Sequence, residues 1–311
     1  MGNIDLIGKR HRIKSLDFFQ QVYKGKNHWY IWILVSLVAF VPFALRIYHY
    51  LFVKVQKPKA PVAIDSNLLL VKGLSHYLFY LVLLLLGVRY LHKRPIRTVF
   101  TSKKKIDWWR YIFGVSSWGL CIVVYFSLNY YFYPDNYQWN FKLVPFLILF
   151  LISFTIVPIG AIFKELYFSG YLLQGIGLLT KRKWVAIVLT SVIYMFAIGM
   201  SPIFEQAGYH VLFFYFASSL FTGIITTIDD GVELAMGLQT ANNIFAILYI
   251  TTNWTGLRTN ALFLDISEPK VLFIVYIPVF IFFPIYFFIL KKMYNWKNTK
   301  EKILDKIVDI K

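Results

Sequence analysis

The chain has 311 residues, of which 58% are hydrophobic and 20% aromatic, and its mean hydropathy is +0.59. These values exclude an ordinary soluble domain and indicate a polytopic membrane protein. The formal net charge of +18 does not indicate a nucleic-acid partner, because the basic residues follow the predicted membrane segments. The single cysteine, Cys121, excludes an intrachain disulfide and a cysteine-built metal site.

Eight apolar runs are each long enough, at about 20 residues, to cross the hydrocarbon as a helix. Their apolar residues are continuous and do not alternate, which favours helices over a closed barrel. The sequence therefore predicts an all-α, polytopic membrane helical bundle of about eight transmembrane helices. The predicted spans are Trp29–Val53, Leu68–Leu91, Trp109–Phe132, Leu143–Phe163, Trp184–Met200, Val211–Ile228, Val232–Thr251 and Val271–Leu290.

The basic residues gather on one side of this topology. They lie at positions 9–26, 89–105 and 181–183 and in the tail, whereas most intervening loops hold fewer Lys and Arg. By the positive-inside rule, both termini are expected in the cytoplasm. We predict a cytosolic N-terminal segment (1–28), a transmembrane bundle (29–290) and a cytosolic tail (291–311). The tail fits either a short amphipathic surface helix or a frayed end.

The run Lys164–Ile176, KELYFSGYLLQGI, is the most informative part of the chain. It places two ionisable residues, Lys164 and Glu165, at the end of a long apolar stretch. Charges at membrane depth are costly, so their presence indicates a functional site. The run resembles the first motif of the CPBP (CAAX protease and bacteriocin-processing, or Abi) intramembrane metalloproteases, which usually reads EExxxR. Lys164 stands at the first glutamate, Glu165 retains the second, and Ser169 stands at the arginine.

Two later runs extend the resemblance. Thr190 to Pro202 reads TSVIYMFAIGMSP, with Tyr194 at the aromatic and Ile198 at the histidine of the family's FxxxH motif. Glu233 to Phe245 reads ELAMGLQTANNIF, with Gln239 at the histidine and Asn243 at the asparagine of HxxxN. The resemblance implies a CPBP-like core at about 143–251. It also implies that the helices with Glu165, Tyr194–Ile198 and Gln239–Asn243 converge around one cavity.

Three substitutions remove the chemistry that the resemblance implies. The family reaction, as generally understood, uses the glutamate as a general base for a metal-held water, and the two motif histidines hold the metal. Charged Lys164 has no acceptor and repels a cation, Ile198 has no ligand atom, and Gln239 is a weak neutral donor. We therefore expect no intact catalytic site and no bound metal.

Alternatives remain for the polar residues. A displaced metal site is conceivable from Glu165, Glu233 and Asn243 with His76 or His210. Lys164 either pairs with Glu233 inside the bundle, in place of a metal site, or extends to the lipid headgroups.

Three classes of function compete. The first is a catalytically inactive CPBP-family pseudoprotease that acts as a membrane scaffold or binds a partner, in bacteriocin immunity or cell-envelope protein control. The second is an active intramembrane metallopeptidase with displaced catalytic residues, which would need zinc. The third is a small-molecule transporter, which should show repeats with broken helices that are not evident here. The motif losses favour the first, with no cofactor. Its expected partners are the lipid bilayer of the cell membrane and another membrane or exported protein, not nucleic acid.

Overall fold

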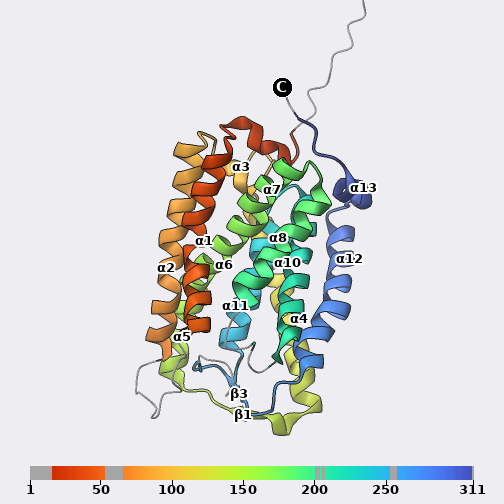
Figure 1. Ribbon diagram of the computed structural model, residues 1–311. Coiled ribbons are helices and arrows are strands. Elements are labelled where there is room, and N and C mark those ends of the chain that lie inside the picture. The colour runs from red at the N-terminus through yellow and green to blue at the C-terminus, as the bar shows by residue number, and fades with distance from the viewer. Residues whose placement is uncertain (1–15, 53–65, 200–203, 205–206, 253–257, 310–311) are drawn as a thin grey trace, which may run out of the picture.

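The computed structural model describes residues 16–52, 66–199, 204, 207–252 and 258–309 (Figure 1). These residues form a bundle of helices with a small sheet at one end. The helices are η1 (Phe19–Lys24), α1 (Trp29–Phe52), α2 (Ser66–Leu86), η2 (Gly87–Leu91), α3 (Arg97–Phe100), α4 (Trp108–Phe132), η3 (Pro134–Asn136), α5 (Leu143–Thr155), α6 (Val157–Glu165), η4 (Leu166–Leu172), α7 (Leu173–Thr180), α8 (Lys183–Gly199), α10 (Tyr209–Asp229), α11 (Glu233–Leu248), η5 (Leu272–Tyr276), η6 (Pro278–Phe282), α12 (Phe283–Met293) and α13 (Thr299–Leu304). The strands are β1 (Tyr137–Trp139), β2 (Ile250–Thr252) and β3 (Phe263–Asp265).

The all-α membrane bundle predicted from the sequence is confirmed, because each of the eight predicted spans coincides with a helix over most of its length. Five helical stretches of the described chain are long and apolar enough to cross a membrane. They are Leu70–Leu91, Trp108–Phe132, Leu143–Thr180, Tyr209–Asp229 and Leu272–Met293. Two shorter apolar helical stretches are Trp29–Leu45, within α1, and Lys183–Gly199, which is α8. Helix α11 has 16 residues.

The fourth predicted span is longer than expected, since the helix that begins at Leu143 continues to Thr180. The charges of Lys164 and Glu165 suggested its end at Phe163. The helix continues because the residues of η4 are apolar or small and are buried inside the bundle. In η4 the backbone widens to a π-helical pitch, a distortion that is frequent at functional sites.

The sheet lies at the lower end of the bundle in Figure 1. Its strand order is β1-β3-β2, with β1 antiparallel and β2 parallel to β3. The seventh predicted span included Ile250 and Thr251, but α11 ends at Leu248 and these residues belong to β2. All three residues of β2 are β-branched, which favours a strand where a partner strand is present.

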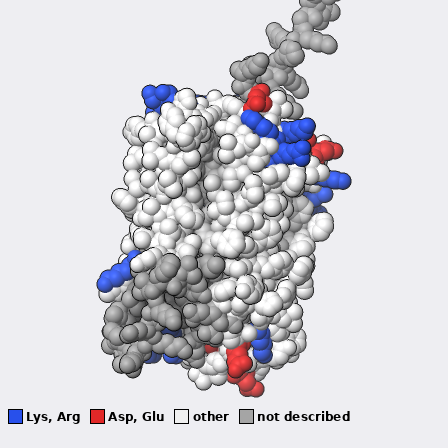
Figure 2. Space-filling model, in the orientation of Figure 1, with Lys and Arg blue, Asp and Glu red and all other residues white. Residues whose placement is uncertain are grey.

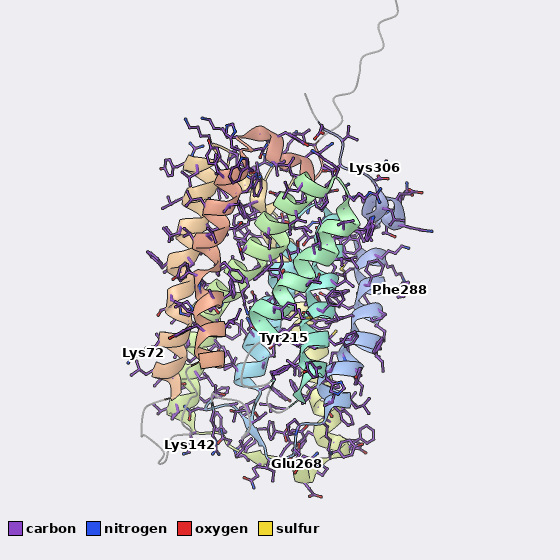
Figure 3. All side chains as sticks on the ribbon, viewed as in Figure 1. Lys72, Lys142, Tyr215, Glu268, Phe288 and Lys306 are labelled. Carbon is purple, nitrogen blue, oxygen red and sulfur yellow. The ribbon has the colours of Figure 1, made fainter. Side chains whose placement is uncertain are left out.

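A belt with almost no charge lies between the two ends of the bundle on the face shown in Figure 2. Figure 2 shows Lys, Arg, Asp and Glu gathered near the two ends of the visible face, with an almost uncharged surface between them. In Figure 3, Lys306 marks the upper end, Lys142 and Glu268 mark the lower end, and Phe288 projects outward between them. Exposed apolar side chains of the belt include Leu37, Phe79, Val82, Leu120, Val124, Leu147, Leu151, Ile285 and Phe288. Such a large apolar surface suits lipid and not water.

Both described ends of the chain pack against the upper end of the bundle (Figure 1). Phe18, Phe19 and Ile307 are buried in the main apolar cluster. In the tail, a short helix, α13, forms over Thr299–Leu304 only, and residues 305–309 are not helical. The described parts of the two predicted flanks are thus integral to the bundle, and their cytoplasmic location stays a prediction.

The central helix α11 crosses α4 at a pair of glycines. A Cβ at Gly237 would lie 2.3 Å from the carbonyl oxygen of Tyr111 and 3.0 Å from the Cα of Gly114. A Cβ at Gly114 would in turn lie 2.9 Å from the carbonyl oxygen of Leu234. Small residues at helix contacts in membranes allow this backbone approach. The position of α11, and of every side chain that it carries, depends on this contact.

We expect Gly237→Ala to destabilise the protein by about 1–3 kcal/mol, because the new methyl group meets rigid backbone and forces the two helices apart. Gly73→Ala is the matched control, since a Cβ on that face of α2 meets nothing within 4 Å. Thermal unfolding in detergent compares the two variants with the unmodified protein. Equal melting temperatures for the two variants would show that the α4 and α11 crossing tolerates separation.

His92 is fully buried just after η2, outside the spanning segments. Its Nδ1 lies 2.8 Å from the carbonyl oxygen of Lys26, and its Nε2 lies 2.8 Å from the hydroxyl of Tyr171. Burial lowers the pKa of His92 to about 4, and the positive charge of Arg94 acts in the same direction. The hydrogen bond to Lys26 opposes this shift without cancelling it. The imidazole is therefore neutral at pH 7.

This burial makes the stability of the protein depend on pH. An unfolded histidine has a pKa of about 6.5, so between that value and the pKa of about 4 in the folded protein the unfolded chain binds more protons. The contribution of neutral His92 to the free energy of unfolding is fully present above pH 6.5. It falls as the pH drops toward 4, by at most about 1.4 kcal/mol per pH unit. His92→Gln should give a flatter dependence of the melting temperature on pH across this window. Parallel curves for the two proteins would contradict this assignment.

Candidate functional site

Glu165, at the end of α6, is held in a buried cluster of hydroxyl groups. Its side chain is only 1% exposed. Ser169, one turn later in η4, donates a hydrogen bond from Oγ to Glu165 Oε2 at 2.6 Å. The same Oγ lies 3.3 Å from the hydroxyl of Thr222 on α10, which donates to the carbonyl oxygen of Ser219. A buried carboxyl group needs such partners, so this cluster stabilises Glu165 in the bundle interior.

The second motif run lies on α8 and packs against the first. Tyr194 and Ile198 are both buried, in the same apolar cluster as Phe168 and Met236. The rings of Phe168 and Tyr194 meet edge to face, with their centroids 4.9 Å apart. Ile198 therefore fills space in an apolar core.

The third run forms most of α11, and its residues are buried or half-buried. Gln239 is 6% exposed, and Asn242 and Asn243 are half-buried. Gln239 and Asn242 line a cavity of about 460 Å³, whereas Asn243 does not. The other walls of the cavity come mainly from α4, α10, η5 and η6.

The three runs come together only in part as expected. Their helices converge, because α11 packs on α6 and α8 packs on η4. The expectation that they share one cavity is wrong for the cavity on α11, whose lining includes none of Glu165, Tyr194 and Ile198. Those positions are occupied by close-packed side chains, so they contribute to the core, whereas the third run lines the cavity.

Comparison with known proteins identifies the region that contains these runs. Residues 144–245 match the family described as Type II CAAX prenyl endopeptidase Rce1-like. This stretch of the chain is therefore similar to the Rce1-like family. The resemblance to CPBP proteins seen in the sequence is thereby confirmed.

A relative of unknown function extends the likeness beyond the Rce1-like region. The chain is 32% identical over 196 residues to YyaK, an uncharacterized protein of Bacillus subtilis (strain 168). The alignment includes 61% of this chain and 64% of that protein, so the chain spans less than two thirds of the length of its relative. No solved structure matches the chain.

The residues present do not fit the metal that the family resemblance implies. Among the described residues, no three His, Cys, Asp or Glu side chains come together in a way that could hold a metal ion. The displaced site conceived from Glu165 and Glu233 with His76 or His210 does not form in this part of the chain. His210 instead lies with Nδ1 2.7 Å from the hydroxyl of Tyr276.

A second polar centre lies at the turn between α10 and α11. Asp229 accepts hydrogen bonds from Lys103 at 2.9 Å and from the indole of Trp296 at 3.1 Å, and it also contacts Arg110. Buried Glu233 accepts from the backbone N–H of Asp107 at 3.1 Å. This centre joins the α10–α11 turn to the segment before α4 and to the C-terminal tail.

Glu233 was expected to be the partner of Lys164. Its Oε2 lies 3.9 Å from Lys103 Nζ, so Lys103 supplies a nearby opposite charge. Lys164 is half-buried on α6. The pair between Lys164 and Glu233 stays a prediction.

Sequence reasoning missed two of the residues that build these sites. The family motif assigns the site position to Asn243 and not to Asn242, although Gln239 and Asn242 are three residues apart and so share a helix face. That spacing was the available signal. Thr222 gave no signal, because only the packing of α10 on η4 brings it to Ser169.

We expect Ser169→Ala to lower the stability of the protein by about 1–3 kcal/mol, because Glu165 then loses a hydrogen bond in the buried cluster. Ser75→Ala on the exposed face of α2 is the matched control and should have little effect. Thermal melts of both variants in the same detergent measure the difference. Unchanged stability of Ser169→Ala would mean that the hydroxyl does not support the carboxyl group.

Proposed function

We propose that this chain is a catalytically inactive pseudoprotease of the CPBP family, which acts as a membrane scaffold and binds a partner protein. The proposed role lies in bacteriocin immunity or in the control of cell-envelope proteins. The match of residues 144–245 to the Rce1-like family supports the scaffold, and the altered motif positions support the loss of catalysis.

One observation carries the proposal: Ile198 lies in a closed apolar cluster where the family has a histidine. An isoleucine cannot bind a metal, because its side chain has no ligand atom. Lys164 and Gln239 replace the other two groups at separate positions, so recovery of the reaction requires three independent changes.

The proposal includes a location and a topology. The uncharged belt and the five long apolar helices support a multi-pass protein of the cell membrane. The described chain ends lie at one end of the bundle, which suits an even number of spans. We assign that end to the cytoplasm from the distribution of basic residues. The expected partners are the lipid bilayer and another membrane or exported protein.

An active metallopeptidase is the alternative, and the Rce1-like match itself favours it. That activity would need a metal site outside the positions of the family motifs. The same experiment separates it from the pseudoprotease.

We expect the full-length protein, purified in detergent, to contain no stoichiometric zinc by elemental analysis and to leave peptide substrates uncut. We expect the triple variant Lys164→Glu, Ile198→His and Gln239→His to bind zinc, because ligand identity is then the missing element on a retained scaffold. The matched control changes only Lys164 and Gln239 and keeps Ile198. It should bind zinc at least about tenfold more weakly, since one imidazole ligand is absent.

Stoichiometric zinc in the unmodified protein, together with peptide cleavage that a chelator abolishes, would overturn the pseudoprotease proposal and establish the peptidase. A melting temperature for the triple variant within a few degrees of that of the unmodified protein confirms that the scaffold is intact before its metal content is compared.

A further inference from the structure

The cavity on α11 has the size and the lining of a ligand site. Its volume of about 460 Å³ lies within the range of small-molecule and cofactor sites. Aromatic side chains form much of its wall, with Trp118 from α4, Phe214 from α10, and Phe273 and Phe283 from the C-terminal helices. An apolar occupant suits this surface.

Two side-chain amides face this apolar cavity without protein partners. Within the described part of the chain, neither Gln239 nor Asn242 forms a side-chain hydrogen bond, although Gln239 is only 6% exposed. Tyr125 and Thr259 of the same lining differ in this respect, because Tyr125 donates to the carbonyl oxygen of Phe273 and Thr259 donates to that of Ile247. The indole Nε1 of Trp118, another lining group, is buried without a hydrogen-bond partner in the described part of the chain.

The amides define the polarity that a ligand must have. Each offers N–H donors and a carbonyl acceptor, and neither carries a charge. Gln239 and Asn242 share a face of α11 and are one helical turn apart. A peptide group, which also has one donor and one acceptor, matches either amide. The tail of a lipid has no hydrogen-bonding group and would leave both amides unpaired.

The cavity also continues toward the sheet end of the molecule. A smaller hollow of about 50 Å³ shares Asn129, Tyr137 and Asp265 with it and adds Glu268 and Lys270. Glu268 lies at the lower end of the bundle in Figure 3, among the connections between strands and helices. Polar and charged groups therefore mark the entrance, and the apolar aromatic walls lie deeper.

We propose that this cavity binds an apolar peptide segment, which enters from the sheet end and pairs its backbone amides with Gln239 and Asn242. This inference rests on the proposed function and specifies the chemistry of the partner. At the position where the family has a metal-binding histidine, Gln239 would instead form hydrogen bonds with a neutral peptide group. The charged residues at the entrance contact the polar end of the same segment.

The test uses the full-length protein in phosphatidylcholine nanodiscs. The probe is a ten-residue Leu and Ala peptide that carries a benzophenone, and cross-linked protein is measured after illumination. We expect Gln239→Leu and Asn242→Leu each to reduce cross-linking at least about fivefold. Gln138→Leu is the matched control, because Gln138 lies exposed on β1 near the same end, outside the cavity. An equally apolar peptide with N-methylated amides should cross-link to the unmodified protein as weakly as the unmethylated peptide cross-links to the two leucine variants.

Stability separates a binding role from a structural one. Gln239→Leu removes an unpaired buried amide, so the melting temperature without peptide should stay equal or rise. A large fall would show that Gln239 supports the fold and would overturn its assignment to the ligand. The Asn242→Leu variant then repeats the binding test at a less buried position.

Two further outcomes overturn the proposal. Equal cross-linking of the peptide to the unmodified protein and to both leucine variants would show that the amides do not recognise it. A phosphatidylcholine with a diazirine in its tail that labels the cavity and excludes the peptide would show that the site holds lipid. Mass spectrometry of the recovered peptide tests the proposed function separately, since a cut peptide contradicts a pseudoprotease even where the peptide binds in this cavity.

Discussion

The backbone contact between α4 and α11 determines the arrangement of most functional features. At Gly114 and Gly237 the two helices approach so closely that neither position has room for a side chain. This contact fixes the rotation of α11, and the rotation decides that Gln239 and Asn242 face the cavity. It also places Glu233, at the first turn of α11, beside the segment that precedes α4. A change in this contact therefore alters the cavity and the polar centre together.

The substituted motif positions form a consistent chemical set. Ser169 donates a hydrogen bond to Glu165 four residues earlier, so the carboxyl group has its partner within the same helical stretch. Ile198 continues the apolar core around Tyr194. Gln239 keeps a polar group at the cavity but removes the basic nitrogen that a metal prefers. Each replacement suits a stable, close-packed interior better than a reactive site.

The sequence predicted the helices because a membrane requires long continuous apolar runs, and that requirement is visible residue by residue. It misplaced the end of the fourth helix because the buried surroundings of η4 come from distant parts of the chain, such as Thr222 on α10, which lies 3.3 Å from Ser169. The sequence also predicted a helix at Ile250 and Thr251, but these residues pair with the strand at residues 263–265. The candidate site was predicted by motif position, which finds the correct helices. The direction in which each of these residues points depends on how its helix is rotated in the bundle, and a sequence motif gives no information on that rotation.

The polar centre at Asp229 has a consequence for the order in which the protein is assembled. Its partners Lys103 and Arg110 precede Asp229 in the chain, whereas its partner Trp296 follows it by more than one helix. Lys302, which donates to the carbonyl oxygen of Ile228 and to Asp230 in the same turn, lies further still along the chain. During synthesis the early partners are available as soon as α10 is inserted, but the late partners emerge only after α12. The α10–α11 turn is therefore first held by two cations from one side and is enclosed by the tail last. The ribosome must release almost the whole chain before this end of the bundle closes.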